Sequence, residues 1–435
     1  MQIIEGIDME PIGSDMYDLM VELFPICRSI TGNGVRKSLE IIGRQIDLRV
    51  VEVPSGTQVF DWTIPKEWNI NDAYVKNAAG EKIIDFQKSN LHILNYSTPV
   101  RKKVGLDELK QHLFTIPEHP EWIPYRTSYY KENWGFCISH NQYRMLSEGE
   151  YDVVIDSSLE KGSLSYGEFF IEGRSREEVL ISCHICHPSL CNDNLSGIAL
   201  STLLAKTLSS APTFYSYRFL FIPGTIGSIT WLAGNTQAVK NIKHGLIVSC
   251  VGDEGKFIYK KTRRGDTEID RVVIHLLKNF QEQHEIIDFF PYGYDERQYC
   301  SPGFNLPVGC LSRSTHGRYP EYHTSGDNFD IVTTANLITS FSLYRSVVAV
   351  LESNTVYVNK NPYCEPQLGK RGLYDEIGAR SGHASDQMAM LWLLNFSDGH
   401  HSLLDISEKS GINFYSLHQI AQILCDYDLL EPYRA

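Results

Sequence analysis

The chain has 435 residues, of which 42% are hydrophobic and 21% are charged, so it is long enough for two or three domains with ample buried core. Its formal net charge of −13 argues against a general nucleic-acid binder, and its ten cysteines are expected as reduced thiols rather than as a disulfide framework. We find no apolar span of about twenty residues and no basic-then-apolar N-terminus, so we expect a cytoplasmic protein without membrane anchor or signal peptide.

The first 47 residues predict two helices of an α/β layer. Ser14 suits a helix N-cap, and Met16, Leu19 and Leu23 follow it at helical spacing, so a helix is expected over residues 14–29. Residues 33–46 have the pattern of a second helix in the same layer.

The character of the chain changes between residues 48 and 143, which predicts a small β-rich insert. Short alternating runs, repeated Pro and Gly, and four of the six tryptophans fall in this stretch. These aromatic side chains either form the core of the insert or include a lid over a ligand site, where they would stack on sugars or apolar groups. The candidates for such a lid are Tyr125, Arg126, Tyr129, Tyr130 and Trp134.

Residues 179–197, VLISCHICHPSLCNDNLSG, are the most informative stretch of the chain. A buried strand is expected over residues 179–182, with His184 and His187 just past its end, and Asp193 opens a turn before a helix over residues 198–208. Ligand sites of open α/β sheets lie at the carboxyl ends of the strands. Imidazole and carboxylate are ligands that hydrolytic zinc prefers, so this stretch predicts a metal site.

Two alternatives apply to the same stretch. The histidines could satisfy buried carbonyl groups while Asp193 acts only as a helix N-cap. Cys183, Cys186 and Cys191 could instead form a zinc or redox site, although a structural zinc site usually needs a second cysteine pair.

Three later segments bear on the same site, and two of them add Asp or His residues in turns. The strand at residues 217–222 ends in Pro223-Gly224-Thr225, and the apolar run at residues 245–251 is followed by Asp253 and Glu254. Residues 320–330, PEYHTSGDNFD, place His323 in a turn-rich stretch ahead of a helix expected over residues 331–351. His, Asp, Asp and His therefore occur in three separate turns of one α/β region, as a zinc hydrolase requires.

The end of the chain predicts a winged helix-turn-helix module over residues 387–435, joined by a linker over residues 366–386 that is rich in Pro and Gly. Helices are expected over residues 388–395, 402–410 and 413–427, followed by a truncated wing at 429–433. Residues 388–435 contain only Lys409 and Arg434 against six acidic residues, so we expect protein contacts or dimerisation rather than DNA binding.

The order His184, Asp193, Asp253, His323 resembles the zinc exopeptidase superfamily that contains bacterial leucyl aminopeptidases and glutaminyl cyclases. Residues 294–308, YDERQYCSPGFNLPV, resemble that superfamily's S-D-x-x-x-F-x-x-x-G-I-P element. The whole chain resembles more closely a bacterial family of polysaccharide-biosynthesis proteins with an aminopeptidase-like domain, an insert before the site and a C-terminal winged helix.

This resemblance implies an α/β fold whose mixed sheet is flanked by helices, the zinc-aminopeptidase-like phosphorylase/hydrolase type. The α/β domain would be discontinuous, with residues 1–47 and 144–365 on either side of the insert at 48–143. The resemblance also implies one zinc ion held by His184, Asp193 and Asp253, with Asp193 bridging to a second metal near His323.

The chain departs from the superfamily pattern at Gly224-Thr225, which occupy the place of a Glu-Glu pair. In the superfamily these glutamates supply the general base and a ligand of the second metal. Loss of a positioned acid/base typically costs about 10²–10⁴-fold in rate. Glu296 and Glu321 are the candidate replacement bases, and His187 is a candidate ligand or proton shuttle. Glu254 is less suitable because adjacent strand residues face opposite ways.

Three functions are therefore open. The first is a zinc-dependent hydrolase that cleaves an amide or peptide bond of a small amino-acyl, peptide or amino-sugar substrate. The second is a catalytically silent metal- or ligand-binding protein of the same fold, and the third is a winged-helix regulator. We expect no nucleic-acid or membrane partner, and a homo-oligomer is an open possibility.

Overall fold

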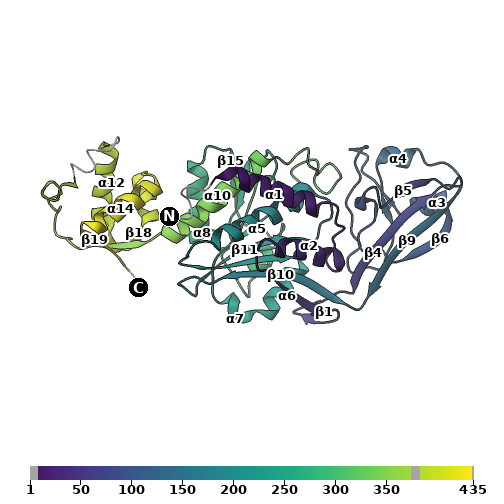
Figure 1. Ribbon diagram of the computed structural model, residues 1–435, viewed down its shortest axis with the longest axis horizontal. Coiled ribbons are helices and arrows are strands. Elements are labelled where there is room, and N and C mark those ends of the chain that lie inside the picture. Colours follow the sequence, from purple (N-terminus) through teal and green to yellow (C-terminus); the bar gives the residue numbers. More distant parts are fainter. Residues whose placement is uncertain (1–7, 374–382, 434–435) are drawn as a thin grey trace. The chain divides into compact units, whose positions relative to one another are not determined.

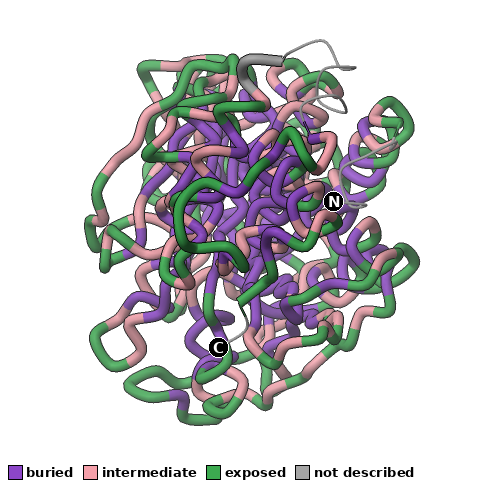
Figure 2. Tube along the Cα trace, turned by 90° about the vertical axis from the view of Figure 1, so that its left-hand side faces the viewer, coloured by how far each residue is buried: buried purple, intermediate pink, exposed green. Residues whose placement is uncertain are grey.

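The computed structural model describes residues 8–373 and 383–433. The chain divides into two compact units, one within residues 2–345 and one within residues 346–435. Helix α10 (Thr334–Ser353) contributes residues to both units. In Figure 2 the buried segments gather in the interior and the exposed residues lie mainly on outer loops.

The larger unit is built on an eight-stranded sheet with the strand order β1-β10-β12-β11-β13-β16-β14-β15 (Figure 1). The strands are β1 (Arg49–Pro54), β10 (Ser163–Ile171), β11 (Glu178–His184), β12 (Ser216–Ile222), β13 (Ile242–Val248), β14 (Phe257–Lys260), β15 (His284–Ile287) and β16 (Val308–Ser312). Strands β12, β11, β13 and β16 run parallel, whereas β10 and β14 run antiparallel to their neighbours β12 and β16. The predicted mixed sheet is confirmed.

The register of the parallel strands brings their carboxyl ends to one edge of the sheet. His184 of β11 lies opposite Ile222 of β12, and Val248 of β13 lies opposite Leu311 of β16. Strand β11 is buried along its whole length, as expected for a central strand covered on both faces. The loops that leave these strands therefore begin next to one another.

Helices cover the sheet. Those near residues 14–29, 33–46, 198–208 and 331–351 were predicted and have changed ends, whereas the helices between residues 226 and 299 were not predicted. The helices are α1 (Met9–Leu23), α2 (Asn33–Gly43), α5 (Gly197–Leu208), α6 (Ile226–Gly234), α7 (Thr236–Val239), α8 (Glu268–Asn279), α9 (Glu296–Tyr299) and α10. Figure 1 shows α1, α2 and α5 in front of β10 and β11, in agreement with the contacts of α1 with α5 and of α5 with β11.

The predicted N-cap of the first helix was wrong. Asp8, not Ser14, caps α1, because its carboxylate accepts a hydrogen bond from the backbone N–H of Glu10 at 3.2 Å. Pro11 is tolerated in the first turn, where backbone N–H groups have no acceptor within the helix.

Helix α10 is long and apolar enough to cross a membrane by length and composition, and the described residues include no other such helix. The sequence analysis had not recognised it as an apolar span. Its side chains Leu337, Phe341 and Tyr344 are buried in the larger unit, as in the core helix of a globular protein.

The insert forms its own four-stranded antiparallel sheet of strands β5 (Lys82–Asp85), β4 (Glu67–Lys76), β9 (Glu150–Glu160) and β6 (Val100–Gly105). Its smaller elements are β2 (Gln58–Val59), β3 (Trp62–Thr63), η1 (Asn90–His92), α3 (Leu106–Lys110), β7 (Leu113–Phe114), β8 (Phe136–Cys137) and α4 (His140–Arg144). The bounds differ from residues 48–143, because β1 pairs with β10 in the main sheet and β9 continues the insert to residue 160.

The smaller unit has the predicted winged helix-turn-helix form. It consists of β17 (Val356–Asn359), η3 (Gly369–Arg371), α12 (His383–Phe396), β18 (Asp398–Ser402), α13 (Leu403–Ser410), α14 (Phe414–Asp426) and β19 (Leu430–Pro432). Strand β17 pairs with β18 and β19, so it belongs to this module rather than to the α/β domain, whose end was expected at residue 365. Residues 374–382 of the predicted linker lie outside the described residues.

Candidate metal centre

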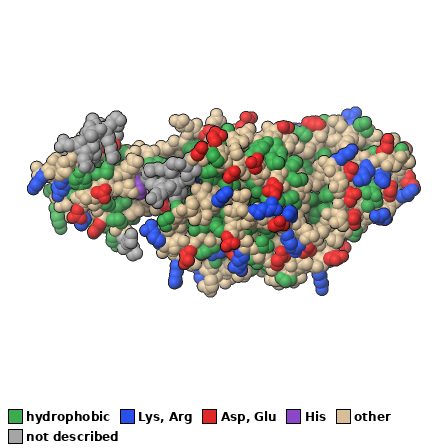
Figure 3. Space-filling view, in the orientation of Figure 1, with side chains coloured by type: hydrophobic (Ala, Val, Ile, Leu, Met, Phe, Trp, Pro, Cys, Tyr) green, Lys and Arg blue, Asp and Glu red, His purple; other side chains and the backbone are tan. Residues whose placement is uncertain are grey.

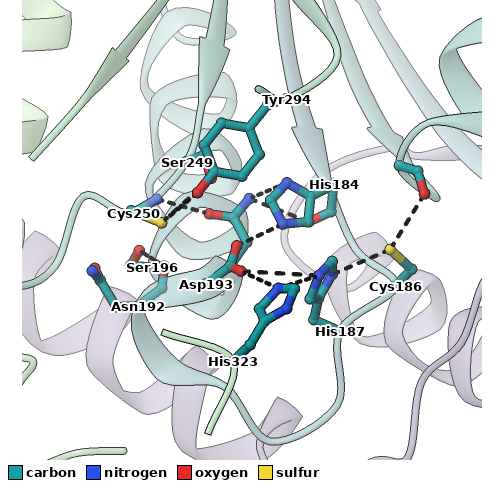
Figure 4. A network of polar contacts seen from close by, with 12 residues as sticks. His184, Cys186, His187, Asn192, Asp193, Ser196, Ser249, Cys250, Tyr294 and His323 are labelled. Carbon is teal, nitrogen blue, oxygen red and sulfur yellow. Dashed lines mark hydrogen bonds and ion pairs between the residues drawn. The ribbon is translucent and has the colours of Figure 1, made fainter. Parts of the chain in front are cut away.

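Two segments that lie far apart in the sequence, residues 184–193 and the stretch around His323, meet at the carboxyl edge of the main sheet. His184 is the last residue of β11, His187 lies in the loop that follows, and Asp193 lies in the irregular turn Cys191–Ser196 before α5. His323 comes from the segment between β16 and α10. Figure 4 shows these four side chains pointing toward one another.

The four side chains approach within hydrogen-bonding distance. His184 Nε2 donates to Asp193 Oδ1 at 2.8 Å, and His323 Nε2 lies 3.1 Å from Asp193 Oδ2. His187 Nε2 lies 3.1 Å from His323 Nε2 and 3.9 Å from Asp193 Oδ2. One carboxylate therefore lies among three imidazoles.

These atoms fit a bound divalent cation. The ligand atoms of His184, His187 and Asp193 all lie within 4.8 Å of one another. Asp193 Oδ2 is buried and forms no hydrogen bond of suitable geometry. A buried carboxylate oxygen without a partner is costly, and a metal ion ligated by this atom would supply the missing interaction.

The protonation states also suit metal binding. Burial lowers the pKa of His187 well below its ordinary value. Burial alone would raise the pKa of Asp193, but its interactions with His187 and His184, including the hydrogen bond from His184, outweigh burial and hold this pKa well below its usual range. A neutral imidazole beside an ionised carboxylate is the state in which both groups act as ligands.

Hydrogen bonds to the backbone fix the turn that carries Asp193. Asp327 accepts from the backbone N–H groups of Asn192 at 2.6 Å and Asp193 at 2.9 Å. Asn194 donates from Nδ2 to the carbonyl oxygens of His184 and Val248. Asp193 is not the helix N-cap, because Ser196 occupies that position of α5.

Arg28 holds the loop that carries His187. Its guanidinium is fully buried and donates from Nε and Nη2 to the carbonyl oxygen of His187 at 3.0 and 2.8 Å. It also donates from Nη1 to Leu23 at 2.6 Å. Burial lowers the pKa of Arg28 to about 10, which leaves it charged at neutral pH.

Asp253 does not join the ligand atoms, although it follows β13 as predicted. Its Oδ2 accepts a hydrogen bond from Asn192 Nδ2 at 3.1 Å, and its Oδ1 accepts from the backbone of Gly255. Asp253 therefore supports the residue next to Asp193, and His187 takes the third position in the group of ligand atoms.

Neither predicted base, Glu296 or Glu321, belongs to the group of candidate ligand atoms or lines the cavity beside it. Glu296 forms a buried ion pair with Lys260, at 2.7 Å between Oε1 and Nζ. Glu321 does not line the cavity beside the histidines, although its neighbour Tyr322 does.

This cavity has a volume of about 240 Å³ and is lined by His184, His187 and Gly224 together with residues that were not predicted as site residues, three of them in the superfamily-like segment 294–308. The latter include Tyr294, Asp295, Arg297, His316 and Tyr322. A larger cavity of about 510 Å³ is lined by residues such as Phe60 and Ile229 and by none of the candidate ligands. The smaller cavity is therefore the candidate substrate site.

Aromatic side chains form walls around the ligands. Tyr294 stacks on His184 with ring centroids 5.2 Å apart, and Tyr125 contacts both His187 and His323 at 5.1 Å. Tyr125 belongs to the insert, and this lid candidate packs against two of the histidines. Trp134 instead stacks on His112 within the insert.

The cysteines near the ligands are protonated thiols. Burial raises the pKa of Cys183 and of Cys186 to about 12. Zinc requires the thiolate, and the group of ligand atoms found among the described residues contains no cysteine. The geometry therefore favours the imidazole and carboxylate site over a cysteine site.

Two family models match the chain. One, described as a domain of unknown function (DUF4910), matches residues 17–354, and one described as a winged helix-turn-helix matches residues 355–432. A protein from Clostridium acetobutylicum is 55% identical over 419 residues, which are 96% of each chain. Its name gives polysaccharide biosynthesis and an aminopeptidase-like domain as a provisional assignment.

Two solved structures are similar to this chain. A crystal structure of a protein from Clostridium acetobutylicum, named provisionally as a peptidase, is 53% identical, covers 98% of this chain and 97% of that chain, and has a TM-score of 0.94. A zinc aminopeptidase from Bacillus subtilis is 12% identical, covers 78% of this chain and 95% of that chain, and has a TM-score of 0.57. The second likeness is one of fold, and it confirms the predicted aminopeptidase-like fold.

Proposed function

The chain belongs to the family described as a domain of unknown function (DUF4910), and we propose that this member is a zinc-dependent hydrolase that cleaves an amide or peptide bond of a small amino-acyl or amino-sugar substrate. The observation that carries the proposal is the buried carboxylate of Asp193 among the imidazoles of His184, His187 and His323. The names of the zinc aminopeptidase and of the Clostridium relative support it.

Zinc held by these residues would supply Lewis-acid polarisation of the substrate carbonyl. His184, His187 and Asp193 would hold the ion, and His323 would complete the ligand set or hold a second ion. The aromatic walls of Tyr125 and Tyr294 exclude water from one side of the ligands and limit the substrate to a small group.

Metal analysis of the purified protein tests this proposal first. We expect about one zinc ion per chain, because His184, His187 and Asp193 offer three ligand atoms close together and the usual Glu-Glu pair is replaced by Gly224-Thr225. Asp193→Ala should lose most of the metal, whereas Asp266→Asn, an exposed carboxylate of the same unit, should retain it. A metal-free wild-type protein would contradict the proposal.

Turnover on a panel of aminoacyl 4-nitroanilides, dipeptides and N-acyl amino sugars tests the reaction. Hydrolysis of one member, abolished by a chelator and restored by zinc, is the expected result. Retention of zinc without turnover would favour the alternative, a binding protein that keeps the fold. The observation that favours this alternative is the replacement of the Glu-Glu pair by Gly224-Thr225.

A further inference from the structure

Asp295 is a buried carboxylate that faces the cavity beside the candidate metal ligands. Its side chain belongs to a residue that is 3% exposed, and the residue lines the cavity together with His184 and His187. It directly precedes α9 and comes from a segment that supplies none of the ligands.

The Asp295 carboxylate lies beside the backbone of Gly224. A Cβ atom on Gly224 would lie 3.2 Å from His184 Cβ and 3.6 and 3.7 Å from the two carboxylate oxygens of Asp295. The Asp295 carboxylate therefore lies against the same point of the chain as the first ligand histidine. In the superfamily pattern, this position of the chain is occupied by the Glu-Glu pair that Gly224-Thr225 replace.

The hydrogen bonds of Asp295 leave one oxygen free. Ser228 Oγ donates to Oδ1 at 3.1 Å and thereby orients the carboxylate from the first turn of α6. Oδ2 accepts no hydrogen bond from a described residue, and it lies 3.6 Å from the Cβ position of Gly224, a residue that lines the same cavity. This oxygen is therefore open to the cavity.

The neighbouring carboxylate of Glu296 has a different role. Lys260 neutralises it at 2.7 Å, and the two side chains are only 5% and 1% exposed. Of the two adjacent acidic residues, one is held in an ion pair and the other faces the cavity. Burial also raises the pKa of Asp295 to about 6, so its carboxylate is a stronger base than an exposed aspartate.

We propose that Asp295 is the proton-accepting carboxylate of the hydrolytic reaction, an inference that rests on the function proposed above. In the reaction a water oxygen forms a bond to the amide carbonyl carbon, and one water proton passes to Asp295. The carbon–nitrogen bond then breaks as Asp295 returns this proton to the leaving nitrogen. The products are a carboxylic acid and an amine, and the Asp295 carboxylate is regenerated.

Asp295→Asn tests the role, since Asn keeps the size of the side chain and still accepts from Ser228. We expect zinc content and the thermal midpoint to stay near those of the wild type, while kcat falls by about 10²-fold or more. Asp295→Glu should restore part of kcat, and Asp266→Asn should leave it unchanged. If Asp295→Asn does not fold, Asp295→Ser is measured in the same way.

Binding of acetohydroxamic acid to the zinc-loaded protein gives a readout that needs no turnover. The hydroxamate transfers its proton to a nearby base when it ligates zinc, so loss of the carboxylate should weaken binding about tenfold or more, as expected for one lost charge-assisted hydrogen bond. Calorimetry in buffers of different ionisation enthalpy should also show proton release to the buffer with Asp295→Asn and not with the wild type.

Three results would overturn the assignment. A kcat of Asp295→Asn within about threefold of the wild type would leave the hydrolase proposal in place and remove Asp295 from it. Loss of zinc from a folded Asp295→Asn would make this residue a metal ligand. If the wild type holds zinc but hydrolyses no substrate of the panel, equal hydroxamate affinity of the two proteins would overturn the role, and weaker binding to the variant would support it.

Discussion

At the scale of single residues, the sequence predicted the ligand types better than the ligand set. His184, Asp193 and His323 were expected together because each follows a strand or a turn at one edge of the sheet, and the structure brings them together. Asp253 follows β13 equally closely, yet the direction of its side chain depends on the loop after the strand. That loop turns the carboxylate to Asn192, which no pattern in the sequence indicates.

Asp295 was missed for a related reason. It is one of two adjacent acidic residues before a short helix, and only the position of Lys260 decides which of them is neutralised. Lys260 lies at the end of β14, whose place beside β16 results from long-range strand pairing. Partners of this kind cannot be assigned from one sequence.

Arg28→Lys should destabilise the protein and weaken zinc binding. Lysine keeps the charge but cannot donate from two nitrogens to the His187 carbonyl while also reaching Leu23, so buried carbonyl oxygens lose partners at a cost of about 1–3 kcal/mol. Denaturant unfolding and zinc titration measure the two effects. Arg264→Lys, at an exposed position, is the control, and equal stability of both variants would contradict the positioning role of Arg28.

At the scale of elements, the local sequence pattern predicted several helices and the central strands, whereas strand pairing decided the boundaries of the domains. Strand β1 is close in sequence to the insert, but it pairs with β10 in the main sheet, and β9 pairs with β4 and β6 of the insert. Strand β17 likewise joins the winged helix through β18 and β19. These partners are distant in the sequence, so composition could not place the domain limits.

Glu67 on β4 connects this strand to α2 and β10 through hydrogen bonds and an ion pair that depend on pH. Its carboxylate accepts from both Nη atoms of Arg36 on α2 at 2.7 Å and from the backbone of Ser163 on β10 at 2.8 Å. The hydrogen bonds from Arg36 hold the pKa of Glu67 at about 2 against the opposing effect of burial. A lowered folded-state pKa stabilises the fold above the unfolded-state value of about 4.3, and this contribution is lost as the pH falls toward 2.

Glu67→Gln should therefore lower the free energy of unfolding at pH 7 by about 1–3 kcal/mol. The difference from the wild type should shrink as the pH is lowered from about 4.3 toward 2, because the wild-type carboxylate then becomes protonated. Urea unfolding at a series of pH values measures this. Glu121→Gln, an exposed carboxylate of the insert, should show no such trend, and a pH-independent difference for Glu67→Gln would contradict the role of its charge.

At the scale of the whole molecule, the candidate site lies within the larger unit alone. All described ligand residues fall between His184 and His323, and the winged helix begins after α10. The face shown in Figure 3 has acidic and basic side chains interspersed rather than gathered in one basic patch. The role of the winged helix is therefore a separate question from that of the metal site.

A chain that ends after Ser353, where the winged helix begins, should keep its zinc. The ligands and the residues that hold their loops all precede this position, so we expect unchanged zinc content per chain. Elemental analysis of the truncated and full-length proteins measures it. Loss of zinc from a folded truncated chain would contradict a site confined to the larger unit.

The winged helix should not bind duplex DNA at micromolar concentration. Residues 388–435 carry two basic and six acidic residues, too few cations to displace the counterions of a duplex. Fluorescence anisotropy with a random duplex at several salt concentrations tests this on the full chain. Micromolar binding that weakens with added salt would revive the regulator hypothesis.

The spread of the ligands along the chain has a consequence for biosynthesis. His184, His187 and Asp193 leave the ribosome well before His323 and Asp327, and at about 5–20 residues per second the delay is roughly 7–30 s. During this interval Cys183, Cys186 and Cys191, which are buried in the folded protein, lie in the same unfinished segment as the early ligands. A nascent chain would therefore present thiols and imidazoles together before all the candidate ligands are available, so under the proposed function the complete zinc site would form only at the end of translation.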